Sequence, residues 1–265
     1  MSKYKLLGEP STNYKASKNL KLFVDSYFLS LAHSDTSGYN VCPFANRVNK
    51  KENNKNKSNC SAVCVAKNGN GNYPRVKNAR TRKTRLFFED RAVFMEMLLE
   101  DIEKAIKNSE KIGHEPTFRL NAYSDILWEK IRINSPGKAF KKGKRNGKTI
   151  FEIFPNVTFY DYTKIPNRKT PKNYQLTYSF WGNKTHYKKA IKSGLNVAMV
   201  FDTQNNKKAP LPPKFDGKKV IDGDLTDLRT RKNDGKNVIV GLRAKMSKAN
   251  INKELEKPVS FVVNA

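Results

Sequence analysis

Six short runs of strand-forming residues follow one another after residue 116 of this 265-residue chain, separated by turn-rich or helix-capable segments. They span residues 117–125, 156–164, 173–180, 195–202, 218–224 and 237–245. Strands that alternate with crossover segments predict parallel pairing, because tight turns cannot join parallel strands. One crossover, residues 183–194, can form a short helix ended by Gly194. We therefore predict an α/β fold, and the length favours a single domain over residues 1–265, with two domains as the alternative.

A long amphipathic pattern precedes these runs. From residue 84 apolar side chains recur at helical spacing, and Gly113 follows as a stop signal. The recurring positions are Phe94, Met97, Leu98, Ile102, Ala105 and Ile106. We predict one helix over this segment, with its aromatic and methionine side chains in the core.

Lysine and arginine outnumber aspartate and glutamate by 52 to 24, which gives a net charge of +28. Such an excess predicts a polyanionic partner, and nucleic acid, either DNA or RNA, is favoured because the charge is spread along the chain. The alternative is a compositional bias toward lysine and asparagine, visible in KKENNKNK (residues 50–57), that carries no function. No apolar run reaches the length of about 18 residues that a membrane span needs, so we expect a cytoplasmic protein without a membrane partner. The oligomeric state stays open.

Two basic segments are the candidate nucleic-acid contacts. The first, RVKNARTRKTR at residues 75–85, follows the cysteines described below, and the second is a glycine- and lysine-rich loop at residues 137–148. Their candidate contact residues are Arg75, Arg80, Arg82, Lys83, Arg85, Lys141, Lys142, Lys144 and Arg145.

All the cysteines of the chain, Cys42, Cys60 and Cys64, lie within residues 41–64. Three thiolates can hold an iron–sulfur cluster or a zinc ion and leave one position open. His33, nine residues before Cys42, can supply the fourth ligand of a zinc site. Residues 46–59 are predicted to be a flexible insertion between two halves of one ligand loop. Reduced thiols without a metal are the remaining alternative.

Polar or acidic residues stand at the ends of several predicted strands, where parallel α/β folds place their active sites. They include Ser179 and Asp202, and the candidate catalytic residues of this region are Asp125, Glu129, Asp161, Lys164, Asp222 and Asp224. Carboxylates of this set can hold Mg²⁺ or Mn²⁺ for phosphodiester cleavage. The alternative is that aspartate and serine stand there because turns and helix N-termini favour them.

Several blocks of the chain together resemble a known family. In order, between residues 38 and 246, they are NVCPFA, CSAVC, VKNARTRKTRLF, FRLNAYSDILWE, VTFYDYTK, YQLTYSF, NVAMVF, VIDGDLTDLR and VIVGLRAK. With them the chain resembles a family of uncharacterised tailed-phage proteins with a three-cysteine segment, whose cysteines stand closer together. The layout is more loosely similar to the radical S-adenosylmethionine (SAM) superfamily, although the cysteine spacing of that superfamily is absent. This second likeness implies a full or partial (β/α) barrel-like parallel sheet, with the cysteine-bearing loop before the main helix.

Three functions follow as hypotheses. The leading one is a phage-encoded, radical SAM-like enzyme that acts on nucleic acid or a nucleotide, with a [4Fe–4S] cluster and SAM held at the three cysteines. The second is an Mg²⁺- or Mn²⁺-dependent nuclease or replication-associated protein with a structural zinc site. The third is a nucleic-acid-binding protein without catalysis, in which the positive charge carries the function.

Overall fold

The computed structural model describes residues 4–42, 71, 73–134, 145–204, 206, 208–245, 251–252, 255–256 and 260–264. The chain divides into two compact units. Unit 1 comprises Met1–Pro43, Cys64–Asp161 and Thr170–Gln175, and unit 2 comprises Phe44–Val63, Tyr162–Lys169 and Leu176–Ala265. The predicted insertion at residues 46–59 and most of the predicted basic loop, residues 137–144, lie outside the described residues.

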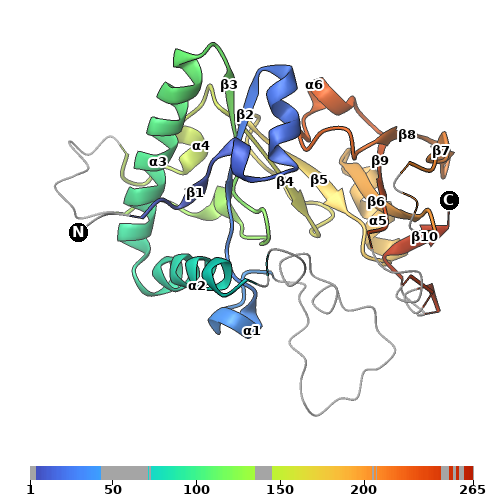
Figure 1. The fold of residues 1–265 in the computed structure, drawn as a ribbon, viewed down its shortest axis with the longest axis horizontal. Coiled ribbons are helices and arrows are strands. Elements are labelled where there is room, and N and C mark those ends of the chain that lie inside the picture. Colours follow the sequence, from blue (N-terminus) through green and yellow to red (C-terminus); the bar gives the residue numbers. More distant parts are fainter. Residues whose placement is uncertain are drawn as a thin grey trace. The chain divides into compact units, whose positions relative to one another are not determined.

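Unit 1 has a mostly parallel sheet with the strand order β1-β2-β3-β4 (Figure 1). β1 (Leu7–Gly8) is antiparallel to β2 (Val24–Leu29), whereas β2, β3 (Glu115–Arg119) and β4 (Thr158–Thr163), which extends just beyond the unit boundary, pair in parallel. The shorter helices of unit 1 are η1 (Pro10–Thr12), η2 (Ala16–Leu22), α1 (Ser34–Ser37), η5 (Trp128–Lys130) and α4 (Ile150–Ile153). The sequence patterns did not indicate β1 or β2.

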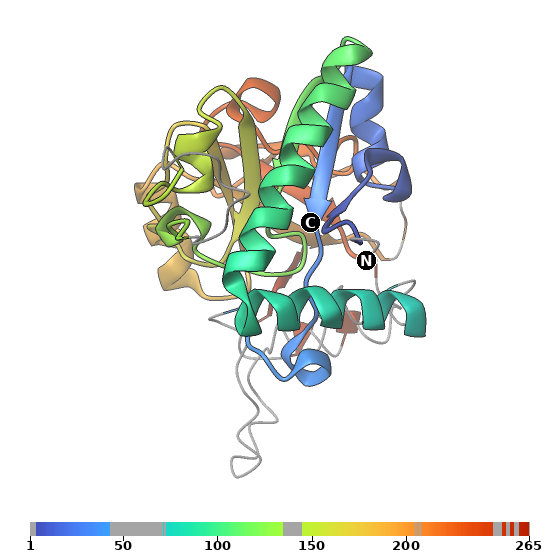
Figure 2. The ribbon, with the colours of Figure 1, turned by 90° about the vertical axis from the view of Figure 1, so that its left-hand side faces the viewer.

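Two long helices follow each other in unit 1, α2 (Pro74–Glu89) and α3 (Arg91–Lys111), and they run in clearly different directions (Figure 2). The prediction of one helix from residue 84 was therefore wrong. The break lies at Asp90, whose backbone leaves the helical region (φ −141°, ψ 76°) and whose carboxylate accepts the backbone N–H of Val93 at 3.1 Å. An aspartate that caps the next helix in this way ends one helix and starts another.

The core of unit 1 lies between α3 and the sheet. The predicted helix positions Phe94, Met97, Leu98, Ile102 and Ala105 are buried, and Ile106 is half-buried. On the sheet, the ring of Tyr27 stacks on Phe118 with centroids 5.5 Å apart, and Phe118 lies at the same distance from Phe159. α3 thus buries the apolar face that its periodicity predicted.

Unit 2 has its own mostly parallel row of strands, in the order β5-β6-β9-β8-β7. β5 (Tyr174–Ser179, which begins in unit 1), β6 (Asn196–Asp202), β9 (Ile239–Arg243) and β8 (Lys218–Asp222) pair in parallel. β7 (Lys214–Phe215) is antiparallel to β8, and β10 (Val262–Asn264) is parallel to β6. α6 (Arg231–Asp234) precedes β9.

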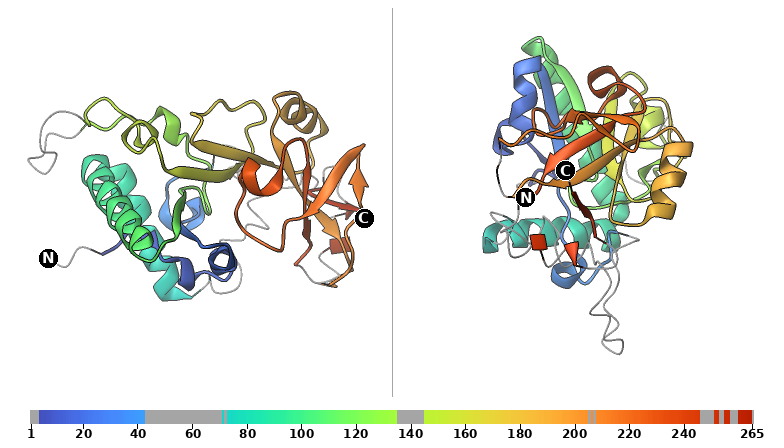
Figure 3. Two further views of the ribbon diagram at one scale, coloured as in Figure 1. Left: turned by 90° about the horizontal axis from the view of Figure 1, so that it is seen from above. Right: turned by 90° about the vertical axis from the view of Figure 1, so that its right-hand side faces the viewer.

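The helix α5 (Lys184–Lys192) lies against this sheet (Figure 3). Its Tyr187 and Ala190 are buried together with Val197, Met199 and Ile239 from β6 and β9. Ser193 caps the helix and Gly194 follows with a φ of 78°, a left-handed value that favours glycine. The predicted short helix and its stop at Gly194 are confirmed.

All six predicted strand runs contain an observed strand, β3, β4, β5, β6, β8 and β9, and the parallel α/β class is confirmed. The predicted barrel is not found. The described strands form open rows, because β1 in unit 1 and β7 in unit 2 each stand at the end of a row and pair on one side only. Among the described residues, no helix is both long enough and apolar enough to cross a membrane.

Candidate functional site

The basic segment at residues 75–85 forms one face of a pocket in unit 1. This segment lies in α2, which begins at Pro74. The helical spacing places Arg75, Arg80 and Lys83 on the side of the helix that lines the pocket, together with Val76 and Ala79. The pocket has a volume of about 550 Å³, which lies in the range of small-ligand sites. Of the predicted basic contacts, these three come together.

The opposite wall comes from the N-terminal part of unit 1 and from the loop after β3. Its lining residues are Gly8, Thr12, Asn13, Tyr14, Phe28, Ser30 and Tyr123. The guanidinium of Arg80 lies 4.3 Å from the ring centroid of Tyr123, a cation–π distance that helps to hold the arginine in place. Three cations therefore face hydroxyl and amide groups across one concave surface.

Lys83 is the most enclosed of the three cations. Its Nζ donates to the backbone carbonyl of Leu6 at 2.5 Å. Burial lowers the pKa of Lys83 to about 8, with nearby Arg80 and Arg82 acting in the same direction and Asp101 of α3 opposing them. The amine is thus charged at neutral pH and loses its proton within an accessible pH range.

These groups suit an oxyanion. Arginine offers several N–H donors in a planar fork, and a lysine ammonium has three, of which the contact with Leu6 uses one. None of the described residues that line the pocket carries a carboxylate. A phosphate group in the pocket can accept charge-assisted hydrogen bonds from Arg75, Arg80 and Lys83, which all line it.

The other predicted basic contacts lie elsewhere. Arg82 is exposed and places its guanidinium 5.0 Å from the ring centroid of Tyr4. Arg85 is exposed on α2, and Arg145 forms an ion pair with Glu103 of α3. None of these three lines the pocket. Lys141, Lys142 and Lys144 lie outside the described residues.

The cysteine segment is described only at Cys42. The Sγ of Cys42 lies 3.8 Å from the carbonyl oxygen of Tyr123, a residue of the pocket wall, and its backbone N–H donates to the side chain of Asn40. His33 is buried and its Nδ1 accepts the backbone N–H of Asp35 at 3.1 Å, which caps α1. Cys60 and Cys64 lie outside the described residues, and the described part of the chain contains no group of three metal-binding side chains.

Asp161 is a buried structural centre in unit 1. Its fully buried carboxylate accepts the backbone N–H groups of Leu120 and Asn121, at 3.2 and 2.8 Å, and the hydroxyl of Tyr174 at 3.0 Å. Arg119 lies 3.9 Å away at its Nε. A carboxylate with this many donors holds the chain that leaves β3 against β4.

Asn121 organises the rest of the same loop. Its Oδ1 accepts from Ser124, from the backbone of Ile126 and from the indole of Trp128, at 2.7, 2.9 and 3.1 Å. Asp125 is buried in this loop and its backbone N–H donates to the carbonyl of Val41, and Glu129 is half-buried in η5. The block FRLNAYSDILWE therefore forms a tightly hydrogen-bonded turn next to Tyr123.

The remaining predicted catalytic residues lie in unit 2. Lys164 donates to Ser179 at 3.3 Å. Asp222 forms a two-point ion pair with Arg243, at 2.9 Å for each contact, and Asp224 contacts Arg243 and Lys245 at 3.3 and 3.0 Å. The Arg243 guanidinium holds the pKa of Asp222 below its usual range. Although burial opposes it, the backbone N–H of Arg243 and the Lys245 ammonium keep the pKa of Asp224 low as well.

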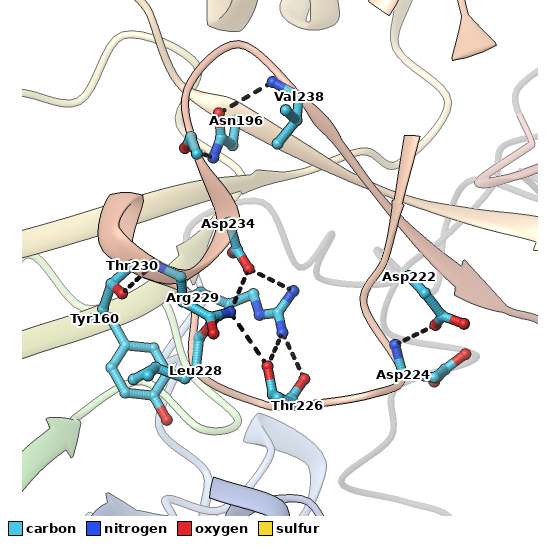
Figure 4. A network of polar contacts seen from close by, with 12 residues as sticks. Tyr160, Asn196, Asp222, Asp224, Thr226, Leu228, Arg229, Thr230, Asp234 and Val238 are labelled. Atoms are coloured by element: carbon cyan, nitrogen blue, oxygen red, sulfur yellow. Dashed lines mark hydrogen bonds and ion pairs between the residues drawn. The ribbon is translucent and has the colours of Figure 1, made fainter. Parts of the chain in front are cut away.

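Sequence reasoning missed a second polar centre of unit 2, between β8 and β9 (Figure 4). The side chains of Arg229 and Asp234 are 1% and 2% exposed and lie 3.4 Å apart, and Arg229 also donates to Thr226. Burial raises the pKa of Asp234, and the Arg229 charge opposes that rise. This buried pair stabilises the segment that leads into α6, and solvent barely reaches its two side chains.

Sequence reasoning also missed the pocket residues Thr12, Asn13 and Tyr14. They lie about 60 positions before α2, and no periodic pattern marks them. The short polar cluster STNY at residues 11–14 is typical of a turn, and that is the only signal by which they stand out.

A protein-family model described as Gene product 88 matches residues 4–256. The match is consistent with the resemblance to a phage-protein family and lends no support to the looser likeness to radical SAM enzymes. No curated protein and no solved structure matches the chain.

Proposed function

This chain belongs to the Gene product 88 family, and we propose that it binds nucleic acid, with the pocket on α2 holding phosphate groups of the backbone. The observation that carries the proposal is the convergence of Arg75, Arg80 and Lys83 on one pocket whose described lining has no carboxylate. Three cations on one concave surface favour an anion, and the fork of each arginine matches phosphate oxygens.

The charge of the whole chain supports a polymeric anion over a small one. The net charge of +28 creates a positive field that attracts nucleic acid from solution and raises the rate of encounter. Phosphate contacts made by lysine and arginine release counterions, so affinity is expected to fall steeply with salt. The pocket then fixes where on the protein the backbone is held.

The amine of Lys83 makes the proposal testable by pH. Because burial places the pKa of Lys83 at about 8, the side chain is cationic at pH 7 and mostly neutral at pH 9. The groups around it are Asp101 of α3, Arg80 and Arg82 of α2 and the carbonyl of Leu6. We expect affinity for a labelled oligonucleotide to fall about tenfold as the pH rises through this range, the loss of one charge-assisted hydrogen bond.

The matched control is Lys83→Arg, since arginine keeps its charge throughout this range. Fluorescence anisotropy at constant ionic strength gives the dissociation constants of both proteins from pH 6.5 to 9.5. Wild-type affinity should decline while the affinity of K83R stays level. Equal declines would show that Lys83 does not contact the phosphate, and the absence of binding at every pH would refute the proposal.

The iron–sulfur enzyme stays a prediction, because Cys60 and Cys64 lie outside the described residues. It rests on the three-cysteine segment, and Cys42 lies beside the pocket wall through Tyr123. Anaerobically purified protein is then expected to be brown, with about four iron atoms per chain, and Cys42→Ser should lower the iron content. Colourless protein that takes up no iron on reconstitution would contradict it, and zinc would favour the structural site.

Metal-dependent cleavage of phosphodiesters likewise stays a prediction. Among its candidate carboxylates, Asp161 accepts three hydrogen bonds, and Asp222 and Asp224 are engaged by Arg243 and Lys245. These contacts favour binding without catalysis as the function that the described geometry supports best.

A further inference from the structure

Tyr14 is the most exposed large apolar side chain in the described part of the protein, at 79% exposure, and it lines the cationic pocket. Scattered exposed aromatics are common on protein surfaces and need no explanation by themselves. This one differs because it stands in the same pocket as Arg75, Arg80 and Lys83.

The backbone around Tyr14 is well ordered by local hydrogen bonds. The side chain of Asn13 accepts the backbone N–H of Lys15 at 2.9 Å, and the carbonyl of Tyr14 accepts the hydroxyl of Ser17 at 3.0 Å. The ammonium of Lys18 lies 5.0 Å from the ring centroid of Tyr14 and adds positive charge beside the ring. The ring is therefore presented from a structured turn between η1 and η2, so binding does not have to order the backbone of this turn.

A second exposed tyrosine stands at the start of α2 and does not line the pocket. Tyr73, at 61% exposure, is the residue that precedes α2 and lies two positions before Arg75. Aromatic rings next to a positively charged groove are the arrangement by which proteins hold single strands, because every base has a face that can stack. In a duplex, both faces of each base are already covered by its neighbours, so a protein ring gains nothing there unless a base leaves the stack.

From this geometry, and resting on the proposed function, we infer that the ligand of the pocket is single-stranded nucleic acid, with a base stacked on the ring of Tyr14 while Arg75, Arg80 and Lys83 hold the adjoining phosphates. The pocket volume of about 550 Å³ lies in the range of small-ligand sites and suits part of a flexible strand. Thr12 and Asn13 supply further polar groups on the same wall.

The test compares two probes of equal length, a labelled single-stranded oligodeoxynucleotide of about 16 nucleotides and the corresponding duplex. Tyr14→Ala is expected to weaken binding of the single strand about five- to hundredfold, the value of one base–aromatic stack, and to leave duplex binding nearly unchanged. Tyr14→Phe keeps the ring and should bind like the wild type. Leu225→Ala, which removes an exposed side chain of unit 2, is the control for unspecific surface effects.

The possible failures are separable. If the wild type binds both probes and Y14A loses affinity for both equally, or for neither, the stacking inference is wrong while the proposed function stands. If the wild type binds neither probe, the proposed function itself fails. Because Tyr14 is so exposed, Y14A should fold normally, and its circular dichroism spectrum and thermal transition check this directly.

Discussion

Changing Arg75, Arg80 and Lys83 together to alanine is expected to abolish most of the nucleic-acid binding of this protein. Each cation can make a charge-assisted hydrogen bond to phosphate worth about 1.5–3 kcal/mol, so the triple variant should lose at least a hundredfold in affinity. Each phosphate contact also makes the slope of log affinity against log salt steeper by about 0.7 for a single strand. The slope of the triple variant should therefore be shallower by about 2. Titrations at several salt concentrations measure both quantities.

The matched control removes the same charge from outside the pocket. Arg82, Arg85 and Arg145 do not line it, and their triple alanine variant lowers the net charge of the chain equally. It should retain the affinity within a few fold, because charges that do not line the pocket act on a phosphate held there mainly through a screened field. If the control loses as much affinity as the pocket variant, net charge alone explains binding and the pocket does not hold the phosphates.

Replacing Asp161 with alanine is expected to destabilise the protein more than any other single change considered so far. The substitution leaves two buried backbone N–H groups and the hydroxyl of Tyr174 without their acceptor. Each such orphaned group costs about 1–3 kcal/mol, and the free energy of unfolding should fall by about 3 kcal/mol or more. The loop after β3, which carries Asn121 and the pocket residue Tyr123, should be disturbed first.

Urea denaturation followed by circular dichroism measures this loss, with Asp90→Ala as the comparison. Asp90 caps α3 through the N–H of Val93 at an exposed position, so its removal should cost only about 1 kcal/mol. Asp161→Asn, which keeps an acceptor oxygen, should fall between the two. A D161A protein with unchanged stability but lost activity on nucleic acid would instead assign Asp161 to catalysis, as the strand-end argument predicted.

Much of the fold was readable in the residues. Runs such as NVAMVF and VIVGLR are rich in β-branched and aromatic residues, and each became a buried parallel strand, β6 and β9. The helix predicted from residue 84 is in fact the end of α2 followed by α3, because Asp90 divides the helical pattern in two. The full or partial barrel expected by analogy was not confirmed, since the described strands form open rows and layout along the chain does not determine whether such a row closes.

The candidate site was readable only in part. The segment around α2 stood out by its charge, yet only Arg75, Arg80 and Lys83 of its candidate contacts line the pocket, whereas Arg82 and Arg85 do not. Asp161 drew attention as a strand-end acid, but its partners come from the loop after β3, some 40 residues earlier in the chain. Such partners carry no pattern that a linear reading can detect.

The sequence by itself determined the six strand runs after residue 116, the helix at Lys184–Lys192 and the charge of this protein, because propensity, periodicity and net charge are local or summed properties of residues. Only the tertiary structure decided which residues meet. In the folded protein α3 packs on the sheet, and the turn at Tyr14 lines the same pocket as α2. Three of the many cations of the chain therefore share one pocket with an aromatic side chain. Contacts between segments that are distant in the sequence depend on how their buried surfaces pack together, and this packing is visible only in the folded protein.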